Sequence, residues 1–471
     1  MRLIYQLGRL DANMESQKFK IAGDADENYI ESELSSLFLK KYFENRKENE
    51  MESETKVILL YPVSLPFNTT LLRSTKLDEK LKEEIVNIWG NEDEYLKNPY
   101  EFFGNNFPYG KEKDDFIVIH SIGKYPYGKD EEGTKEIRFD TVYGDIVLEI
   151  FLDMLKRYLK ENNLISEAYI DISSGHNIYI SAMLEALRHF ATFTNLRHWV
   201  DKRKRPKLFI TICDPILPGS QNVHQVYREE QRFVVFFESP LKLNDLKKIE
   251  KIFFNNDEFK KDVKDVLERF LLTFSAIKNN VPLYLFDANS FIDKSDEVSK
   301  MLSNVVEYLH NKITESYRYS PKLDKSICIR IINALGFYLG IIDVMNYSKI
   351  SPYEPKKGIL IKDVKDKVIE MYDKFGLTNN IDILEVELHK LRGLYKKIDP
   401  KLIKEKCNNY LEKIKNGKDS KDRMQRNFFA HCGLEEHFVF VAEEKEGTFV
   451  RYIEELPELR DTIKEMLLQR I

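Results

Sequence analysis

The sequence predicts an α/β domain followed by an all-α domain. At 471 residues the chain is longer than one hydrophobic core usually serves, and 42% of its residues are apolar, which suffices for two cores. Short apolar runs alternate with helical stretches in the first half, whereas amphipathic helices follow one another in the second half. Because the pattern changes near Pro240, we predict one domain over residues 1–240 and a second over residues 241–471.

The first half contains short apolar segments that we predict to be strands. They are nearly continuous in apolar residues, as expected of parallel strands that are covered on both faces. Helical stretches separate them, so they should form βαβ units and a doubly wound, Rossmann-like sheet. The predicted strands are Arg2–Leu7, Lys56–Pro62, Asp115–Ser121, Glu167–Ile172 and Lys207–Cys213, with one or two more in Gln225–Glu238. The predicted helices are Asn28–Phe43, Thr141–Lys160 and Asn177–Thr194, and the charged segments Glu44–Lys56 and Asp130–Glu136 are expected to be surface loops.

From about Lys242 onward the pattern predicts an α-helical bundle with one small β-element. Apolar runs at Phe438–Ala442 and Thr448–Ile453 flank Glu446-Gly447, which is typical of a β-hairpin, and a final helix should reach Ile471. The other predicted helices are Phe259–Lys278, Ser295–Tyr317, Lys325–Tyr347, Ile361–Phe375, Ile383–Lys415 and Ser420–Cys432.

The composition excludes several classes of protein. The formal net charge is −5, so a nucleic acid would have to be held by a local patch rather than by the whole molecule. The cysteines Cys213, Cys328, Cys407 and Cys432 are scattered, which is typical of reduced thiols in a cytoplasmic protein. No signal-peptide pattern is present, and the apolar stretch Ile331–Met345 is short for a membrane span. We therefore predict a soluble cytoplasmic protein without membrane association.

The segment Arg426–His431, with the sequence RNFFAH, is predicted to lie on one helix. Asp419-Ser420 supplies candidates for its N-cap, and Gly433 is placed to end it. Four residues separate Asn427 from His431, so a helix would place these side chains one above the other, with Arg426 at their flank.

These residue types suit metal-independent cleavage of RNA. His431 can take the proton of a 2′-hydroxyl or protonate the leaving 5′-oxygen, and Arg426 can neutralise the charge of the transition state. Asn427 can fix the imidazole or contact the substrate. Two such helices across a dimer axis could enclose a phosphodiester. The alternative is that His431 is an ordinary surface or core residue, because this spacing also arises by chance.

A polar turn at Asp171–Asn177, with the sequence DISSGHN, follows a predicted strand and precedes a predicted helix. Such a turn exposes backbone N–H groups at a helix N-terminus, which favours a phosphate ligand. Gly8-Arg9 follows the first predicted strand, and strand ends of this kind form the ligand edge of a doubly wound sheet. The alternative is that Gly, Ser and Asp serve only the geometry of the turn. The turn contains neither a GxGxxG nor a GxxxxGK[ST] motif, which disfavours a dinucleotide cofactor and NTP hydrolysis.

Both motifs resemble those of one family. RNFFAH resembles the R-N-x-x-x-H signature of HEPN ribonucleases that are fused behind a CARF domain in type III CRISPR defence, and DISSGHN is similar to the CARF ligand motif D-x-[ST]-x-G-x-N. The resemblance implies a cyclic oligoadenylate as activator, with the tetra-adenylate favoured, and no metal or other cofactor. It assigns catalysis to Arg426, Asn427 and His431, and ligand contacts to Gly8, Arg9, Ser173, Ser174, Gly175, His176 and Asn177.

The resulting hypothesis is a homodimer, or higher oligomer, that cleaves single-stranded RNA when the cyclic ligand binds. The cleavage should leave a 2′,3′-cyclic phosphate and a 5′-hydroxyl, and it should require no stable association with the CRISPR effector complex. Two alternatives stay open at this point. One is a ligand-sensing regulatory or interaction protein with an inert helical domain, and the other is a ring nuclease that degrades its own cyclic ligand.

Overall fold

A computed structural model of the chain folds into two compact units. The first comprises Met1–Asn195, Lys202–Val234 and Ser303–Ile329, and the second comprises Leu196–Asp201, Val235–Leu302 and Arg330–Ile471. We propose that the boundary between the two domains lies between residues 240 and 241. The structure describes residues 1–471 apart from the short segments 11–15, 25–28, 47–53, 74–76, 106–113, 131–132, 161–164, 216–221, 254–256, 288–291, 355, 395–399, 417–419 and 454–456.

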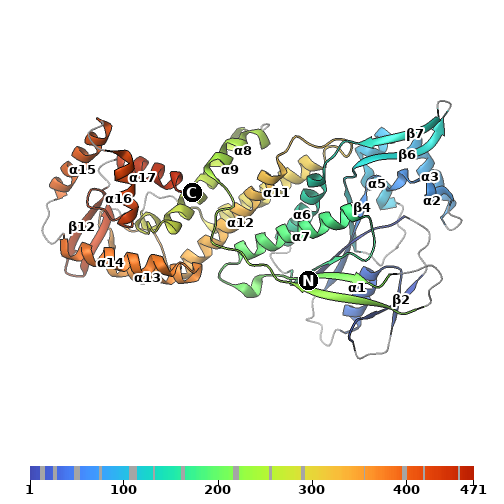
Figure 1. Cartoon of the computed structure of the whole chain (residues 1–471), viewed down its shortest axis with the longest axis horizontal. Coiled ribbons are helices and arrows are strands. Elements are labelled where there is room, and N and C mark those ends of the chain that lie inside the picture. The colour runs from blue at the N-terminus through green and yellow to red at the C-terminus, as the bar shows by residue number, and fades with distance from the viewer. Residues whose placement is uncertain are drawn as a thin grey trace. The chain divides into compact units, whose positions relative to one another are not determined.

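A mixed sheet forms the centre of the first unit (Figure 1). Its described strands lie in the order β3-β2-β10-β9-β8-β1-β4-β5. The strands from β9 to β5 in this order are parallel to one another, whereas β10 runs antiparallel to β9. The strands are β1 (Arg2–Leu7), β2 (Gln17–Ile21), β3 (Ile30–Ser32), β4 (Thr55–Pro62), β5 (Asp115–Ile119), β8 (Glu167–Asp171), β9 (Lys207–Cys213) and β10 (His224–Gln231).

The strand order places a topological switch point between β1 and β8. After β1 the chain first forms β2 and β3 at the edge beyond β10. It then forms β4 and β5 on one side of β1, and later β8 and β9 on the other side. In doubly wound sheets ligands bind beyond the C-terminal ends of the strands at such a switch point. The predicted Rossmann-like class is confirmed.

Helices cover both faces of this sheet, which explains the continuous apolar strands. On one face Ile4 and Tyr61 belong to a core with Phe38 of α1 (Ser35–Asn45) and Phe103 of α5 (Pro99–Asn105). On the other face the hydroxyl of Tyr5 donates a 2.9 Å hydrogen bond to Asp153 on α6 (Tyr143–Lys160). Helix α7 (Asn177–Arg197) contacts α6 through aromatic rings.

Two predictions for the first unit were wrong in detail. The segment Asn28–Phe43 is not one helix, because Ile30 pairs with Phe19 in the sheet and α1 begins only at Ser35. The segment Asp130–Glu136 is not a simple surface loop. Its residues Asp130 and Gly133–Glu136 belong to two paired strands, β6 (Gly123–Asp130) and β7 (Gly133–Phe139). Tyr127, Ile137 and Phe139 of these strands are buried. Short helices complete this region: α2 (Thr69–Arg73), α3 (Glu79–Gly90) and α4 (Glu92–Lys97).

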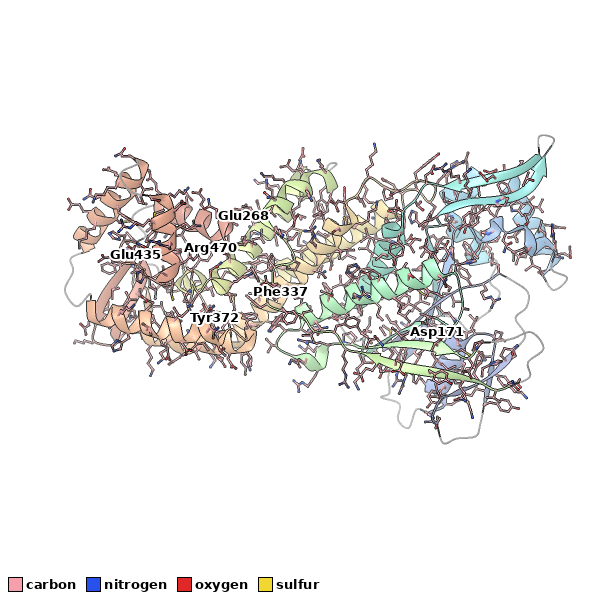
Figure 2. The ribbon with its side chains drawn as sticks, viewed as in Figure 1. Asp171, Glu268, Phe337, Tyr372, Glu435 and Arg470 are labelled. Carbon is pink, nitrogen blue, oxygen red and sulfur yellow. The ribbon has the colours of Figure 1, made fainter. Side chains whose placement is uncertain are left out.

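The second unit is mainly helical, as predicted. Aromatic side chains fill its centre, where Trp199 stacks on Phe337, which is labelled in Figure 2, at 5.3 Å between ring centroids. Phe237 likewise stacks on Phe274 at 4.9 Å. The helices are α8 (Leu246–Ile252), α9 (Asp257–Lys278), α10 (Leu283–Phe286), α11 (Ser295–Ile313), α12 (Lys325–Tyr347), α13 (Ile361–Phe375), α14 (Thr378–Leu394), α15 (Pro400–Lys415), α16 (Lys421–Ala430) and α17 (Pro457–Gln469), of which α11 and α12 also contribute residues to the first unit.

Three features of the second unit differ from the predicted helices and strands or add to them. The predicted helix Ile383–Lys415 is two helices, and the second begins at Pro400, a residue that suits the first turn of a helix but not its interior. The predicted hairpin is present as β12 (Val439–Glu444) and β13 (Gly447–Tyr452), and the short β11 (Ile359–Leu360) pairs with the outer edge of β13. Helix α12 is long and apolar enough to span a membrane, but 83% of its most apolar window is buried in the protein, as in a core helix.

Candidate functional site

Helix α16 presents the RNFFAH segment between buried anchors. Met424 and Phe428 lie four residues apart and are 2% and 0% exposed, so one face of the helix is fixed in the core. Arg426 lies on the opposite, exposed face, and Asn427 is half-buried. Arg426 makes neither a hydrogen bond nor an ion pair with any described residue, which leaves its guanidinium available for an anionic ligand.

A tight turn fixes the position of His431. The helix ends at Ala430 rather than at Cys432 as predicted, and the backbone N–H of His431 donates to the carbonyl of Asn427 at 3.0 Å. The chain then turns sharply, since Cys432 and Gly433 have φ values of +54° and +68°. A Cβ on Gly433 would lie 2.6 Å from Cγ1 of Val281, so only glycine fits. Ser420 is the N-cap residue without a capping hydrogen bond from its side chain, and Asp419 lies outside the described residues.

The sequence interpretation missed a carboxylate beside His431. Oε2 of Glu387, on α14, lies 2.9 Å from Nδ1 of His431. Its other oxygen accepts a 2.7 Å hydrogen bond from Lys390. Burial opposes the ionisation of Glu387, but the hydrogen bonds from Lys390 and His431 outweigh it and lower the pKa of this carboxyl. The two residues are 44 positions apart in the sequence, so no local motif could have revealed the pair.

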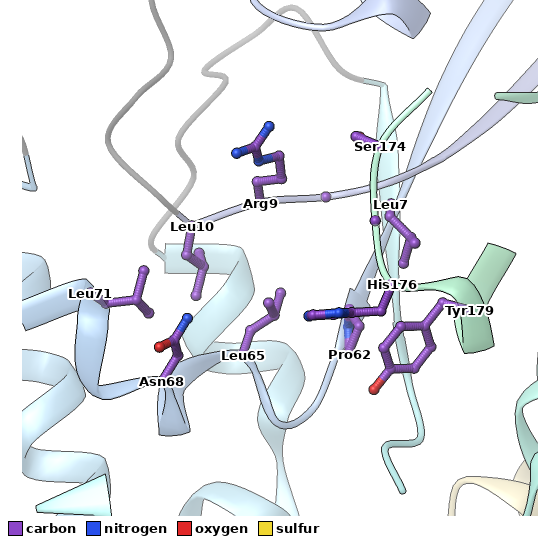
Figure 3. A pocket seen from close by; sticks show the side chains of 12 residues that line it. Leu7, Arg9, Leu10, Pro62, Leu65, Asn68, Leu71, Ser174, His176 and Tyr179 are labelled. Carbon is purple, nitrogen blue, oxygen red and sulfur yellow. The ribbon is translucent and has the colours of Figure 1, made fainter. Parts of the chain in front are cut away.

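A cavity of about 350 Å³ lies at the switch point of the sheet in the first unit (Figure 3). Five of the predicted ligand residues line it, namely Gly8, Arg9, Ser174, Gly175 and His176. Ser173 and Asn177 are not among the lining residues. Pro62, at the end of the second predicted strand, also lines the cavity, as expected of a residue at this edge of the sheet. The sequence interpretation missed the other lining residues, which are Leu7, Leu10, Leu65, Asn68, Leu71 and Tyr179.

Two glycines allow the chain to come together at this edge of the sheet. Gly175 has a φ of +122°, and a Cβ on it would lie 2.2 Å from Cδ1 of the buried Leu7. A Cβ on Gly8 would lie 2.3 Å from Cε1 of Tyr61. The turn after β8 can therefore lie against Leu7 of β1 because Gly175 lacks a side chain, and the ring of Tyr61 can lie against the end of β1 because Gly8 lacks one.

Asp171 holds the turn rather than facing the cavity. Its carboxylate is fully buried and accepts a 2.9 Å hydrogen bond from the backbone N–H of Ser173. Burial raises the pKa of Asp171, although its hydrogen bonds partly offset this effect. Gln6 donates to Asp171 at 3.4 Å and to the hydroxyl of Ser174 at 3.3 Å, so β1, β8 and the turn are tied together.

The cavity combines an apolar wall with groups that favour an anion. The ring of His176 and the side chains of Leu65 and Pro62 lie near one another in Figure 3, whereas Arg9 and Ser174 lie toward another edge. The first turn of α7 adds backbone N–H groups and the positive end of the helix dipole. Such a site suits a ligand that carries both planar bases and phosphates.

Within the described residues no group of three or more His, Cys, Asp or Glu side chains is placed to hold a metal ion. Cys213, Cys328, Cys407 and Cys432 are all free and buried.

Two family models match the chain. The model for the CARF domain of the CRISPR system endoribonuclease Csx1 matches residues 2–215, and the model for the HEPN domain of the same endoribonuclease matches residues 377–455. The cavity lies in the first region, and Glu387, Arg426, Asn427 and His431 lie in the second. Residues 216–376 lie outside both matches. No curated protein matches the chain.

Proposed function

Because the chain belongs to the CARF–HEPN accessory ribonucleases of CRISPR systems, we propose that it is an endoribonuclease that a cyclic oligoadenylate activates. It cleaves single-stranded RNA without a metal ion in antiviral defence. The observation that carries this proposal is the position of His431. Its half-exposed ring contacts Glu387, and Asn427 and the exposed Arg426 precede it on α16, within the region that the HEPN model matches.

The proposed reaction uses the 2′-hydroxyl of the substrate as nucleophile. The 2′-oxygen attacks phosphorus while His431 takes its proton, and the bond from phosphorus to the 5′-oxygen breaks as that oxygen receives a proton. The products are a 2′,3′-cyclic phosphate and a 5′-hydroxyl, and no water or oxidant is consumed. Arg426 holds the phosphate through a bidentate contact and neutralises the charge that develops on it, while Asn427 positions the substrate or the ring.

A second copy of the chain is proposed to complete the site. Ile383 and Val386, on the same helix as Glu387, are 49% and 54% exposed, so an apolar surface adjoins the residue that contacts His431. A two-fold interface over this surface would place two copies of Arg426 and His431 near one substrate. The two histidines could then divide the roles of base and acid.

We further propose that the cavity at the ends of β1 and β8 binds the cyclic oligoadenylate, with the tetra-adenylate favoured. Arg9, His176 and the N-terminus of α7 are suited to its phosphates, and the apolar lining is suited to its bases. The contacts of Ser173 and Asn177 with the ligand remain part of the proposal. Binding would activate the ribonuclease if the ligand contacts the active state of the protein better than the inactive state.

The test is an RNA cleavage assay with the purified protein and labelled single-stranded RNA. We expect cleavage to depend on cyclic tetra-adenylate, to survive EDTA, and to fall by about 10³-fold or more in Arg426→Ala and His431→Ala. Arg423→Ala, which changes another exposed arginine of the same helix, is the matched control and should retain activity. Full activity in either site variant would refute the assignment. Loss of the cyclic ligand without cleavage of RNA would indicate a ring nuclease, and stable binding without either reaction would indicate a regulatory protein.

A further inference from the structure

We propose that Glu387 is the positioning residue of the ribonuclease site, which holds the imidazole of His431 in one orientation and one tautomer. This inference rests on the proposed function, because it assigns a role relative to the catalytic histidine. It concerns the 2.9 Å contact between Oε2 of Glu387 and Nδ1 of His431.

The two side chains differ in exposure in the way that this role requires. The side chain of Glu387 is 10% exposed, whereas that of His431 is 44% exposed. The carboxylate therefore lies on the protein side of the ring and is screened from solvent, while the ring itself remains accessible. Nε2 of His431 has no hydrogen-bond partner among the described residues, so it is the nitrogen available to a substrate.

The carboxylate is held in its ionised form by a second donor. Lys390, one turn further along α14, donates to Oε1, while His431 occupies Oε2. The thiol of Cys432 also lies near the pair, and burial raises its pKa to about 12, so it stays neutral. The pKa of Glu387 is lowered as a result of the two donors, against the effect of burial. Glu387 is thus an acceptor and not a donor.

An ionised acceptor at Nδ1 determines what Nε2 can do. In the neutral ring the single proton is drawn to Nδ1, where it is donated to Glu387, and Nε2 presents a lone pair. That lone pair can receive the proton of the 2′-hydroxyl. When Nε2 is protonated, the same carboxylate stabilises the resulting imidazolium, from which the proton can pass to the 5′-oxygen. This arrangement follows the general logic of an acid–base histidine that a buried carboxylate orients.

A buried asparagine keeps the two elements of the pair in register. The side-chain amide of Asn280 donates to the carbonyl of Asn380 in the first turn of α14 at 3.0 Å. It also donates to Sγ of Cys432, the residue after His431, at 3.2 Å. Asn280 itself has a φ of +58°, a conformation that asparagine tolerates better than most residues. The helix that carries Glu387 and the turn that carries His431 are therefore tied to the same side chain.

The test compares Glu387→Gln and Glu387→Asp with the parent protein in ligand-activated RNA cleavage. A glutamine of the same shape retains the packing but can present its amide to Nδ1, so we expect kcat to fall by about 10–100-fold while KM changes little. Glu387→Asp should recover part of this loss because it restores the charge. The matched control is Glu385→Gln on the same helix, which removes an exposed carboxylate that pairs with Lys365 at 2.9 Å, and it should retain full activity.

A second readout separates orientation from folding. ¹⁵N NMR of the histidine side chains should show His431 of the parent protein as the Nδ1–H tautomer, and a mixture of tautomers in Glu387→Gln. Wild-type kcat in Glu387→Gln, or an unchanged tautomer, would overturn the positioning role. If His431→Ala retains cleavage, the proposed function itself fails. If His431→Ala is inactive and Glu387→Gln is fully active, only the role of Glu387 fails.

Discussion

Each unit contains a histidine whose Nδ1 lies 2.9 Å from a glutamate oxygen, yet the two pairs are built for different purposes. In the first unit His120 contacts Glu149, and in the second His431 contacts Glu387. His120 is 0% exposed and its Nε2 also contacts the carbonyl of Ser316 at 3.0 Å, so both nitrogens are used. The side chain of His431 is 44% exposed, and among the described residues only its Nδ1 has a hydrogen-bond partner. A contact between Nδ1 and a glutamate is therefore compatible with a structural role and with a catalytic role. The two roles differ in whether Nε2 is bound within the protein or is open to a substrate.

The pair in the first unit is best described as a buried imidazolium. Both partners of His120 are acceptors, a carboxylate and a carbonyl, so both ring nitrogens must carry a proton to satisfy them. Burial alone would lower the pKa of His120, but the charge and hydrogen bond of Glu149 outweigh it and raise that pKa. The pair ties the segment around Ser316 to the end of β5, where the ring of Tyr317 also lies 5.0 Å from that of His120.

The largest expected effect is a difference in stability between the two histidines. His120→Ala leaves the buried Glu149 without its charged partner, although the backbone N–H of residue 120 still donates to it, so we expect the free energy of unfolding of the first unit to fall by about 3–5 kcal/mol. His431→Ala should lower stability by less than about 1 kcal/mol, because its pair is partly exposed. Urea unfolding followed by circular dichroism and hydrogen exchange measures both. Equal losses in the two variants would break the distinction between the pairs.

His120→Gln is the milder variant for the case in which His120→Ala does not fold. Its amide can donate to one acceptor but cannot serve both sides, so an intermediate loss is expected.

A smaller loss of stability is expected for a substitution at Gly175, in the turn that borders the cavity. Gly175→Ala should destabilise the first unit by about 1–3 kcal/mol and weaken the binding of cyclic tetra-adenylate, because it adds both backbone strain and a contact with Leu7. Gly123→Ala is the matched control, since Gly123 has a φ of +101° but nothing within 4 Å of an added Cβ. Calorimetric titration measures the affinity for the ligand and thermal unfolding measures the stability of both variants. Equal losses in the two variants would show that backbone strain, and not the contact with Leu7, explains the effect at Gly175.

The smallest expected effect is a dependence of stability on pH. Because the folded state raises the pKa of His120 above its usual value near 6.5, the imidazolium stabilises the first unit fully below about pH 6.5 and progressively less as pH rises through the folded-state pKa. The charged groups that raise it are Glu149 and Asp145. The melting temperature should therefore fall by a few degrees from about pH 6 to pH 9. This slope should flatten in His120→Gln, and an identical slope in that variant would contradict the assignment.

Much of the fold could be predicted because its signals are local. β1 and β9 have the predicted bounds, since their apolar runs end at turn residues. The α/β class, the helical second half and the C-terminal hairpin are also confirmed. The hairpin of β6 and β7 was missed because its charged residues were considered without the buried Tyr127 and Ile137 between them.

The candidate sites divide in the same way. Gly8 and Gly175 could be found because a turn needs its residues to be adjacent in sequence. Leu65, Asn68 and Glu387 could not, since each reaches its site from a part of the sequence far from the motif. Long-range partners of this kind depend on how helices pack, and a single sequence carries no direct record of that packing.

The short strand β11 has a practical consequence for anyone who wishes to study the ribonuclease part alone. Ile359 and Leu360 pair with Val450 and Phe449 of β13, but they precede the region of residues 377–455 that the HEPN model matches. A fragment cut at residue 377 would leave one edge of β13 with open hydrogen-bonding groups, which invites aggregation. A fragment that begins before Gly358 keeps this edge covered. The family boundary is therefore a poor guide to where the chain should be cut.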